Sequence, residues 1–151
     1  GKVYDRNIKV GIMVETPSTA IVAYKFAKEV DFFSIGTNDL TQYFLAVDRG
    51  NEMVSTLYNS FNPAVLEAIQ KVIDAAHDAN INVSMCGEFA GDKKATKLLL
   101  GMGLDSFSMS ASSGLQVKKI IRNSSYEEAQ KYRDLILQQN TPEEVLEHLL
   151  P

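Results

Sequence analysis

The amide of Asn38 and the carboxylate of Asp39 stand where a short apolar segment, residues 32–35, gives way to Gly36 and Thr37. We expect the apolar segment to be a strand and the two polar side chains to lie at its tip, where a helix begins. Backbone N–H groups, an amide and an acid at one strand tip suit a phosphate and the cation that accompanies it. The pattern therefore predicts a phosphate-binding site that uses a metal ion.

Two further apolar segments also end in residues that can do chemistry. Glu15 follows residues 12–14, and Cys86 follows residues 83–85. Glu15 and Asp39 are 24 positions apart, one strand–helix–strand cycle, so their strands are expected to be neighbours about 5 Å apart. Two carboxylates at that spacing can share a hard cation such as Mg²⁺, and no histidine or second cysteine lies near to favour Zn²⁺. The same acids also fit a role as helix caps, and the pattern alone leaves both roles open.

Four other side chains have both a chemical and a structural interpretation. Asn38 can donate its amide to a phosphate or carboxylate oxygen, or serve as a turn residue. Arg49 can clamp a phosphate through its guanidinium, or remain a solvated surface charge. Cys86 can deliver a proton to a carbanion-like carbon, since thiols are mostly protonated at neutral pH, or fill space as a small buried hydrophobe. Glu88 can orient Cys86, although we favour a cap of the next turn.

The elements that must position these residues follow a regular strand–helix order. Apolar segments predict strands at about 8–14, 31–35, 82–86 and 106–110. Helical periodicity, with its caps and prolines, predicts helices at about 19–30, 63–79, 92–102 and 114–122. Capping boxes that start at Ser125 and Thr141 predict two terminal helices, at about 125–139 and 142–150.

Four consecutive strand–helix units with polar residues at the strand tips predict an α/β fold, the C-terminal half of a (β/α)₈ TIM barrel followed by two helices. An open doubly wound sheet would also bind ligands at its strand tips, but chemistry on successive strands favours the barrel. A complete barrel takes about 250 residues. We therefore interpret residues 1–151 as one partial barrel domain and expect further barrel segments N-terminal to it.

Composition narrows the classes of function. With 151 residues, 45% of them hydrophobic, the chain can bury one core. A net charge of −4 without any basic run argues against a nucleic-acid partner. No apolar run is long enough to span a bilayer, so we expect no membrane partner. The single cysteine excludes an internal disulfide and fits a reducing compartment, so we interpret the chain as a cytoplasmic protein.

Several strings in the chain are similar to the C-terminal, phosphoenolpyruvate (PEP)-binding domain of enzyme I of the bacterial PEP:sugar phosphotransferase system. They cover almost the whole chain: GIMVETP at 11–17, DFFSIGTNDLTQY at 31–43, LAVDRGN at 45–51, MCGE at 85–88, AGD at 90–92 and KKIIR at 118–122. Pyruvate phosphate dikinase and PEP synthase share the NDLTQ and CGE cores. The AVDRGN segment and the methionine before Cys86 resemble enzyme I rather than those two.

The resemblance implies a role for each candidate residue. Glu15 and Asp39 would bind Mg²⁺. Asn38, Asp39 and Arg49 would hold PEP, and Cys86 would protonate the enolate carbon as pyruvate forms. In this family the phosphoryl group passes to a histidine on a separate N-terminal domain and then to the carrier protein HPr, in sugar uptake. PEP, pyruvate and HPr are therefore the expected partners, HPr through the full-length enzyme.

Two departures from the family limit what the chain is expected to do alone. The histidine domain is absent, and neither His77 nor His148 should be taken for the family's phosphohistidine, because both fall in acid-rich helical stretches. The early barrel strands, which supply further arginines in the family, are absent as well. We therefore expect a fragment of enzyme I that cannot turn over alone. A half-barrel leaves two sheet edges and its inner face open, so we also expect a homodimer or larger assembly.

Three other interpretations fit the same residues. The chain can be a binding module that senses PEP without transferring its phosphoryl group. It can be a structural fragment that binds no ligand. The third is a free-standing lyase or kinase that uses Mg²⁺–enolate chemistry, which the short N-terminus disfavours.

Overall fold

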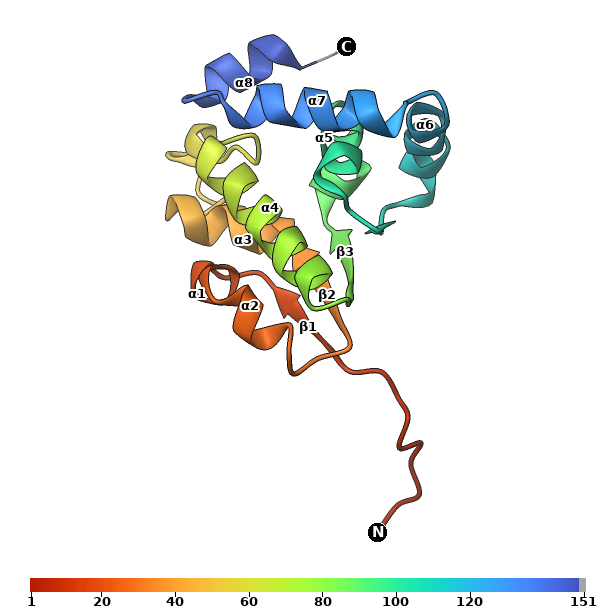
Figure 1. Ribbon diagram of the computed structural model, residues 1–151. Coiled ribbons are helices and arrows are strands. Elements are labelled where there is room, and N and C mark those ends of the chain that lie inside the picture. The colour runs from red at the N-terminus through yellow and green to blue at the C-terminus, as the bar shows by residue number, and fades with distance from the viewer. Residues whose placement is uncertain (150–151) are drawn as a thin grey trace.

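Four short parallel strands form one sheet in chain order. The computed structural model describes residues 1–149. The strands are β1 (Gly11–Val14), β2 (Phe32–Gly36), β3 (Asn82–Cys86) and β4 (Ser106–Phe107). Each strand pairs with the next in parallel, with Met13 opposite Ser34, and Ser34 opposite Ser84. This arrangement confirms the predicted α/β fold with four consecutive parallel units (Figure 1).

Helices connect every strand to the next and follow the last one. Between β1 and β2 lie α1 (Pro17–Ile21) and α2 (Ala23–Phe26). Between β2 and β3 lie α3 (Thr37–Leu45), a short 3₁₀ turn η1 (Ser55–Leu57) and α4 (Pro63–Asp78). Between β3 and β4 lie η2 (Glu88–Gly91) and α5 (Lys93–Met102). After β4 come α6 (Ala111–Arg122), α7 (Tyr126–Leu137) and α8 (Pro142–His148).

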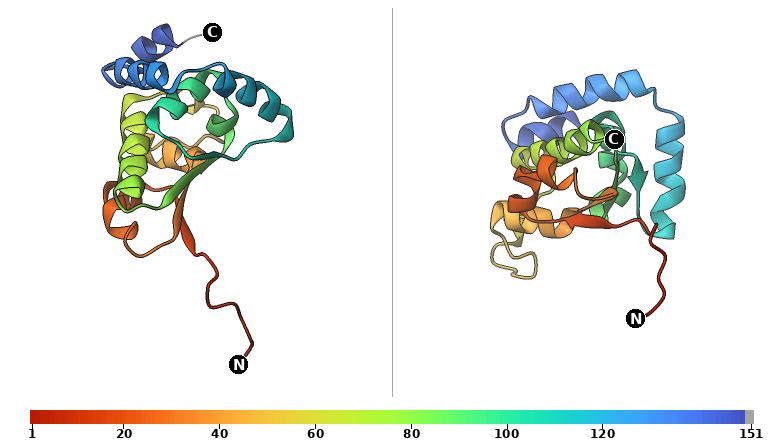
Figure 2. Two further views of the ribbon diagram at one scale, coloured as in Figure 1. Left: turned by 45° about the vertical axis from the view of Figure 1, so that its right-hand side comes forward. Right: turned by 60° about the horizontal axis from the view of Figure 1, so that its bottom comes forward.

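One face of the sheet is covered by helices and the other is open. The covered face carries fully buried side chains: Val14, Phe33, Ile35, Val83 and Met85. On the opposite face Met13 is 45% exposed and Phe32 is 37% exposed, although both are large and apolar. Figures 1 and 2 show α1, α2 and α4 along the covered side only. The open face is the one that would line the interior of a complete barrel.

Local sequence signals explain where most helices begin. Pro63 occupies the first turn of α4, where its missing N–H costs nothing, and the Asn62 side chain accepts a hydrogen bond from the Ala64 N–H. Asp92 caps α5 in the same way, through the Lys94 N–H. Ser125 and Thr141 cap the last two helices, since each side chain accepts the N–H of the residue three positions later.

Several elements differ in length from their predicted ranges. β1 begins at Gly11 rather than residue 8, because Val10 donates its N–H to the Asp31 carboxylate instead of a strand. The predicted helix at 19–30 is two short helices, interrupted at Val22 by a non-helical backbone. β4 ends at Phe107, although the next residue still donates to the Met85 carbonyl. The last helix ends at His148, and residue 150 lies outside the described residues.

The carboxylate of Asp31 organises the entry into β1. It accepts the Val10 N–H at 2.8 Å and the Lys9 ammonium at 3.0 Å. The Val10 N–H, and to a smaller extent Lys9, hold the pKa of Asp31 below its ordinary value. This exposed ion pair therefore favours the charged carboxylate in the folded chain.

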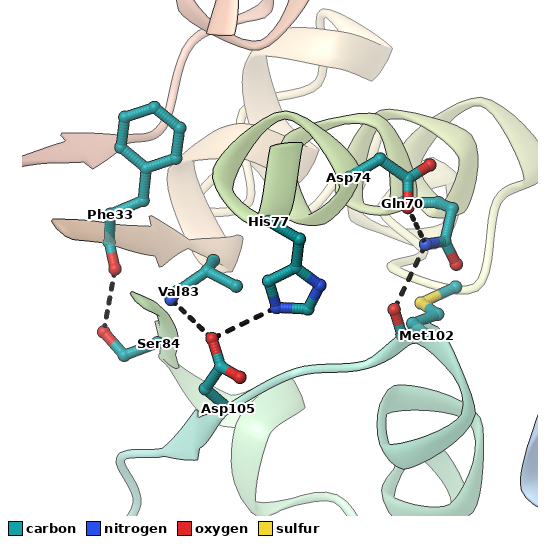
Figure 3. A network of polar contacts seen from close by, with 8 residues as sticks. All are labelled: Phe33, Gln70, Asp74, His77, Val83, Ser84, Met102 and Asp105. Carbon is teal, nitrogen blue, oxygen red and sulfur yellow. Dashed lines mark hydrogen bonds and ion pairs between the residues drawn. The ribbon is translucent and has the colours of Figure 1, made fainter. Parts of the chain in front are cut away.

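A polar network ties α4 to the entries of β3 and β4, at the end of the sheet opposite the strand tips (Figure 3). His77 Nε2 lies 3.2 Å from an Asp105 carboxylate oxygen that also accepts the Val83 N–H at 2.9 Å. About two turns earlier on α4, Gln70 donates to Asp74 and to the Met102 carbonyl. His77 thus connects the end of α4 to the entry of β4.

Among residues 1–149, no helix combines the length and apolar character that crossing a bilayer requires.

Candidate active site

The C-terminal tips of β1, β2 and β3 meet around Gly36. A Cβ atom built on Gly36 would lie 3.1 Å from both Cβ and Oε2 of Glu15, and 3.2 Å from the Met13 sulfur. A side chain at this position would therefore press against Glu15 and Met13, and glycine leaves room for Glu15 to lie across the end of β2. This places the Glu15 carboxylate on the open face, above the strands that carry the other candidates.

The thiol of Cys86 faces the same side of the sheet. Its Sγ lies 3.8 Å from the Met13 sulfur, 3.7 Å from the Ile35 carbonyl oxygen and 3.9 Å from the Ser34 hydroxyl. Cys86 is partly accessible rather than buried in the core. The Met13 side chain therefore contacts Cys86 and lies, like the Glu15 side chain, beside Gly36. Two of the predicted residues, Glu15 and Cys86, are thus close to the same point of the sheet.

Asn38 is held by the tip of β3. Its Oδ1 accepts the Glu88 N–H at 3.3 Å, and this hydrogen bond joins the first turn of α3 to the start of η2. That bond uses the amide oxygen, so the NH₂ group of Asn38 is left as a donor. Glu88 itself is exposed, and its backbone makes this contact. Within residues 1–149 the Glu88 side chain forms no hydrogen bond to Cys86 and none that caps η2, so its role as a cap stays a prediction.

The backbone at the β3 tip needs glycine. Gly87 has φ +97°, a conformation that side chains rarely adopt. A Cβ at this position would also lie 2.6 Å from the Thr37 hydroxyl and 3.0 Å from the Asn38 amide oxygen. The close approach of β3 to the start of α3 therefore depends on Gly87.

The donor set at these tips fits a hard divalent cation. The carboxylates of Glu15 and Asp39 are both partly buried, and neither forms a hydrogen bond or ion pair with another of the described residues. No cluster of three or more His, Cys, Asp or Glu ligands occurs in residues 1–149. Mg²⁺ commonly binds through one or two carboxylates and takes its other ligands from water and substrate phosphates. Glu15 and Asp39 are therefore the residues of this region that could hold such a cation.

A cavity of about 460 Å³ opens beside these residues, between the tips of β3 and β4. Asn38 and Cys86 form part of its wall. The remaining wall consists of Gly87, Glu88, Gly91, Ser108, Met109, Ser110 and Ser113. Its three serines were not among the predicted site residues. Ser108 and Ser110 lie inside the segment that was predicted as the fourth strand, and Ser113 follows it, so their only signal was the high serine content of residues 106–113.

Of the predicted site residues, only Asn38 and Cys86 line this cavity, and Glu15, Asp39 and Arg49 are not part of its wall. Arg49 lies apart from the strand tips, in the loop that follows α3. Its side chain is exposed and pairs with no acid among residues 1–149. Its backbone N–H donates to the Gln42 side chain at 3.2 Å, which ties the loop to the end of α3. The loop starts at Ala46, in the left-handed conformation, and turns away from the helix there.

The chain is similar in sequence to several known proteins. Residues 1–126 match the PEP-binding domain of PEP-utilising enzymes. The phosphoenolpyruvate-protein phosphotransferase of Haemophilus influenzae is 59% identical over 145 residues, which are 96% of this chain and 25% of that protein. The proteins of the same name from Bacillus subtilis and from Buchnera aphidicola subsp. Schizaphis graminum are 55% and 54% identical, over 97% of this chain and 26% of each relative. The chain thus spans about a quarter of the length of the curated relatives it matches.

Proposed function

The chain belongs to the PEP-utilising enzymes, as part of their PEP-binding domain, and from this we propose that it carries the PEP and Mg²⁺ site of a phosphoenolpyruvate-protein phosphotransferase. The observation that carries the proposal is the convergence of Glu15, Asn38 and Cys86 around Gly36. Each of the three comes from a different strand tip. Under this proposal they would act as a metal ligand, an anion donor and a proton donor on one side of the sheet.

Glu15 and Asp39 are the proposed Mg²⁺ ligands. Both carboxylates are partly buried and lack a partner among the described residues, so a cation can bind without first breaking an ion pair. When bound, the cation would neutralise charge on the phosphoryl group during transfer. Asp39 in the first turn of α3 also lies where a helix favours a negative group.

Asn38 and Arg49 are the proposed PEP-binding residues, with Asp39 beside them. The NH₂ group of Asn38 is available as a donor because the Glu88 N–H occupies its oxygen. We propose that Arg49 reaches the phosphate after a movement of its loop, since its side chain is exposed and unpaired within residues 1–149. A guanidinium would then contact two phosphate oxygens at once.

Cys86 is the proposed general acid. Loss of the phosphoryl group from PEP leaves an enolate, and transfer of the thiol proton to its terminal carbon gives pyruvate and a thiolate. A proton from solvent then restores the thiol. The partial exposure of Cys86 at the edge of the cavity leaves the sulfur within reach of a substrate and of water.

We propose that the rest of the reaction depends on segments beyond this chain. In the whole protein the phosphoryl group would pass to a histidine on an N-terminal domain and then to HPr, for sugar uptake. We do not propose His148 as the acceptor; it ends α8, where its Nδ1 contacts the Glu144 carbonyl oxygen of the same helix. The fragment alone would therefore bind PEP without turning it over.

Assembly and location are further parts of the proposal. The open inner face, with Met13 and Phe32 partly exposed, and the free edges of β1 and β4 favour a homodimer or larger assembly. A thiol that acts as a general acid must stay reduced, so we propose a cytoplasmic location.

Calorimetric titration of the chain with PEP, with and without Mg²⁺, tests the proposal. We expect binding that needs Mg²⁺ and that weakens about tenfold or more in Asp39→Asn, since a charge-assisted contact contributes about 1.5–3 kcal/mol. Asp78→Asn is the matched control, because Asp78 is an exposed acid at the far end of α4. Binding that ignores Mg²⁺, or that both variants weaken equally, would contradict the proposed site. A folded chain that binds nothing would instead support the interpretation as a structural fragment.

A further inference from the structure

Thr37 is a fully buried polar residue at the junction of two strand tips. It is the first residue of α3 and directly follows β2. Its side chain has no exposed surface, and its hydroxyl donates to the Cys86 carbonyl oxygen at 2.9 Å. A buried hydroxyl is favourable only when it is hydrogen-bonded, so this bond fixes the distance between the two tips.

The hydroxyl acts on the residue that carries the thiol. The carbonyl of Cys86 belongs to the peptide that leads into Gly87, whose backbone lies against the Thr37 hydroxyl. The next residue of α3, Asn38, holds the next peptide of the same tip through the Glu88 N–H. Two consecutive α3 residues therefore grip two consecutive peptides of the β3 tip.

We propose that Thr37 is a positioning residue that sets the direction of the Cys86 thiol relative to the Asn38 amide. That this direction matters for proton transfer rests on the proposed function, whereas the contact between Thr37 and Cys86 does not. Without the hydroxyl, the Cys86 carbonyl loses this donor and the Cys86–Gly87 peptide gains freedom to rotate. The thiol then leaves its contacts with Met13 and the Ile35 carbonyl for part of the time.

The test measures the alkylation rate of Cys86 by iodoacetamide in the full 151-residue chain, where it is the only cysteine. Thr37→Val keeps the shape and removes the hydroxyl, and we expect alkylation about tenfold faster, the effect of losing one buried hydrogen bond. Thr37→Ser retains the hydroxyl and is expected to restore the original rate. Thr41→Val is the matched control, because Thr41 is equally buried in α3 and its hydroxyl pairs with Ser60 instead.

A nuclear magnetic resonance measurement reports the contacts between α3 and the tip of β3, whereas alkylation reports the accessibility of the Cys86 thiol. The side-chain NH₂ signals of Asn38 and the amide signal of Glu88 are expected to shift in Thr37→Val and to stay in place in Thr41→Val. In the unmodified chain, the Thr37 hydroxyl proton is expected to exchange slowly enough to give its own signal with a contact to Gly87. This last measurement needs no variant and so does not depend on whether Thr37→Val folds.

Several results would overturn the inference. An unchanged alkylation rate in Thr37→Val, or a Thr37→Ser rate equal to that of Thr37→Val, would show that the hydroxyl does not matter. An equal change in Thr41→Val would show general loosening of α3. A rapidly exchanging Thr37 hydroxyl would show that the bond is absent. None of these readouts requires PEP, so a failed PEP titration leaves them interpretable.

Discussion

Gly101 lies where the backbones of α5 and α7 are in close contact. Replacing it with alanine has two opposing effects on stability, because alanine favours the helix while its Cβ disturbs the packing. Gly101 is buried near the end of α5. A Cβ at this position would lie 2.0 Å from the carbonyl oxygen and 2.5 Å from the carbonyl carbon of Ala129 in α7. The Arg133 side chain also donates to the Gly101 carbonyl, so the contact is held from both sides.

The magnitude follows from two opposing effects. Helix propensity alone would make Gly101→Ala more stable by about 1 kcal/mol. The clash involves backbone atoms, which cannot turn aside as a flexible side chain can, so α5 and α7 must separate. Overpacking of this kind costs about 1–3 kcal/mol, and contact with backbone atoms places this case near the upper end. We expect a net loss of about 2 kcal/mol in the free energy of unfolding.

Urea unfolding at equilibrium, compared with Gly114→Ala, measures the effect. Gly114 lies inside α6 with no atom within 4 Å of a Cβ, so alanine there should stabilise the chain by about 0.5–1 kcal/mol. The two substitutions are chemically identical and should differ in sign. A Gly101→Ala chain as stable as the unmodified one would refute the close approach of α5 and α7.

Two further substitutions test local features of the fold. Ala46 ends α3 with φ 51° and ψ 40°, a conformation that favours glycine, so Ala46→Gly should raise stability by about 0.5–1 kcal/mol, and an unchanged thermal midpoint would contradict the left-handed cap. The lowered pKa of Asp31 adds stability that is present above its ordinary value of 3.8 and is lost as the pH falls through the folded-state pKa. Asp31→Asn should therefore lower the thermal midpoint at pH 7, and the difference should shrink as the pH falls below 3.8 and through the folded-state pKa; a constant difference at all pH values would contradict this linkage.

The sequence predicted the strand tips because apolar segments end there in polar residues. Glu15, Asn38 and Cys86 each follow such a segment, and parallel strands must end at one edge of the sheet. The structure brings these three together. Spacing alone could not predict how they touch, because the sulfur of Met13 and the missing side chain of Gly36 determine those contacts.

Other features had no signal in the sequence. A threonine beside Asn38 reads as one more polar residue, and only the three-dimensional approach of β3 gives the Thr37 hydroxyl its partner. The break at Val22 also went unpredicted, since the apolar pattern continues through it and tertiary packing decides the backbone there. For Arg49 the resemblance to the family implies contact with PEP, whereas the structure leaves its side chain exposed on a loop. The conformation of that loop could not be predicted from the sequence.

Manganese titration followed by nuclear magnetic resonance tests the central claim most directly. Mn²⁺ can replace Mg²⁺ at oxygen ligands and broadens the signals of nearby nuclei. In the presence of PEP, the account predicts that broadening is strongest at the amides of Glu15, Asp39 and Gly87, which belong to three separate strand tips. It also predicts sharp signals for His77 and Asp105, at the opposite end of the sheet. Broadening centred on acids elsewhere on the surface, or spread evenly over the chain, would contradict a site assembled by the strand tips.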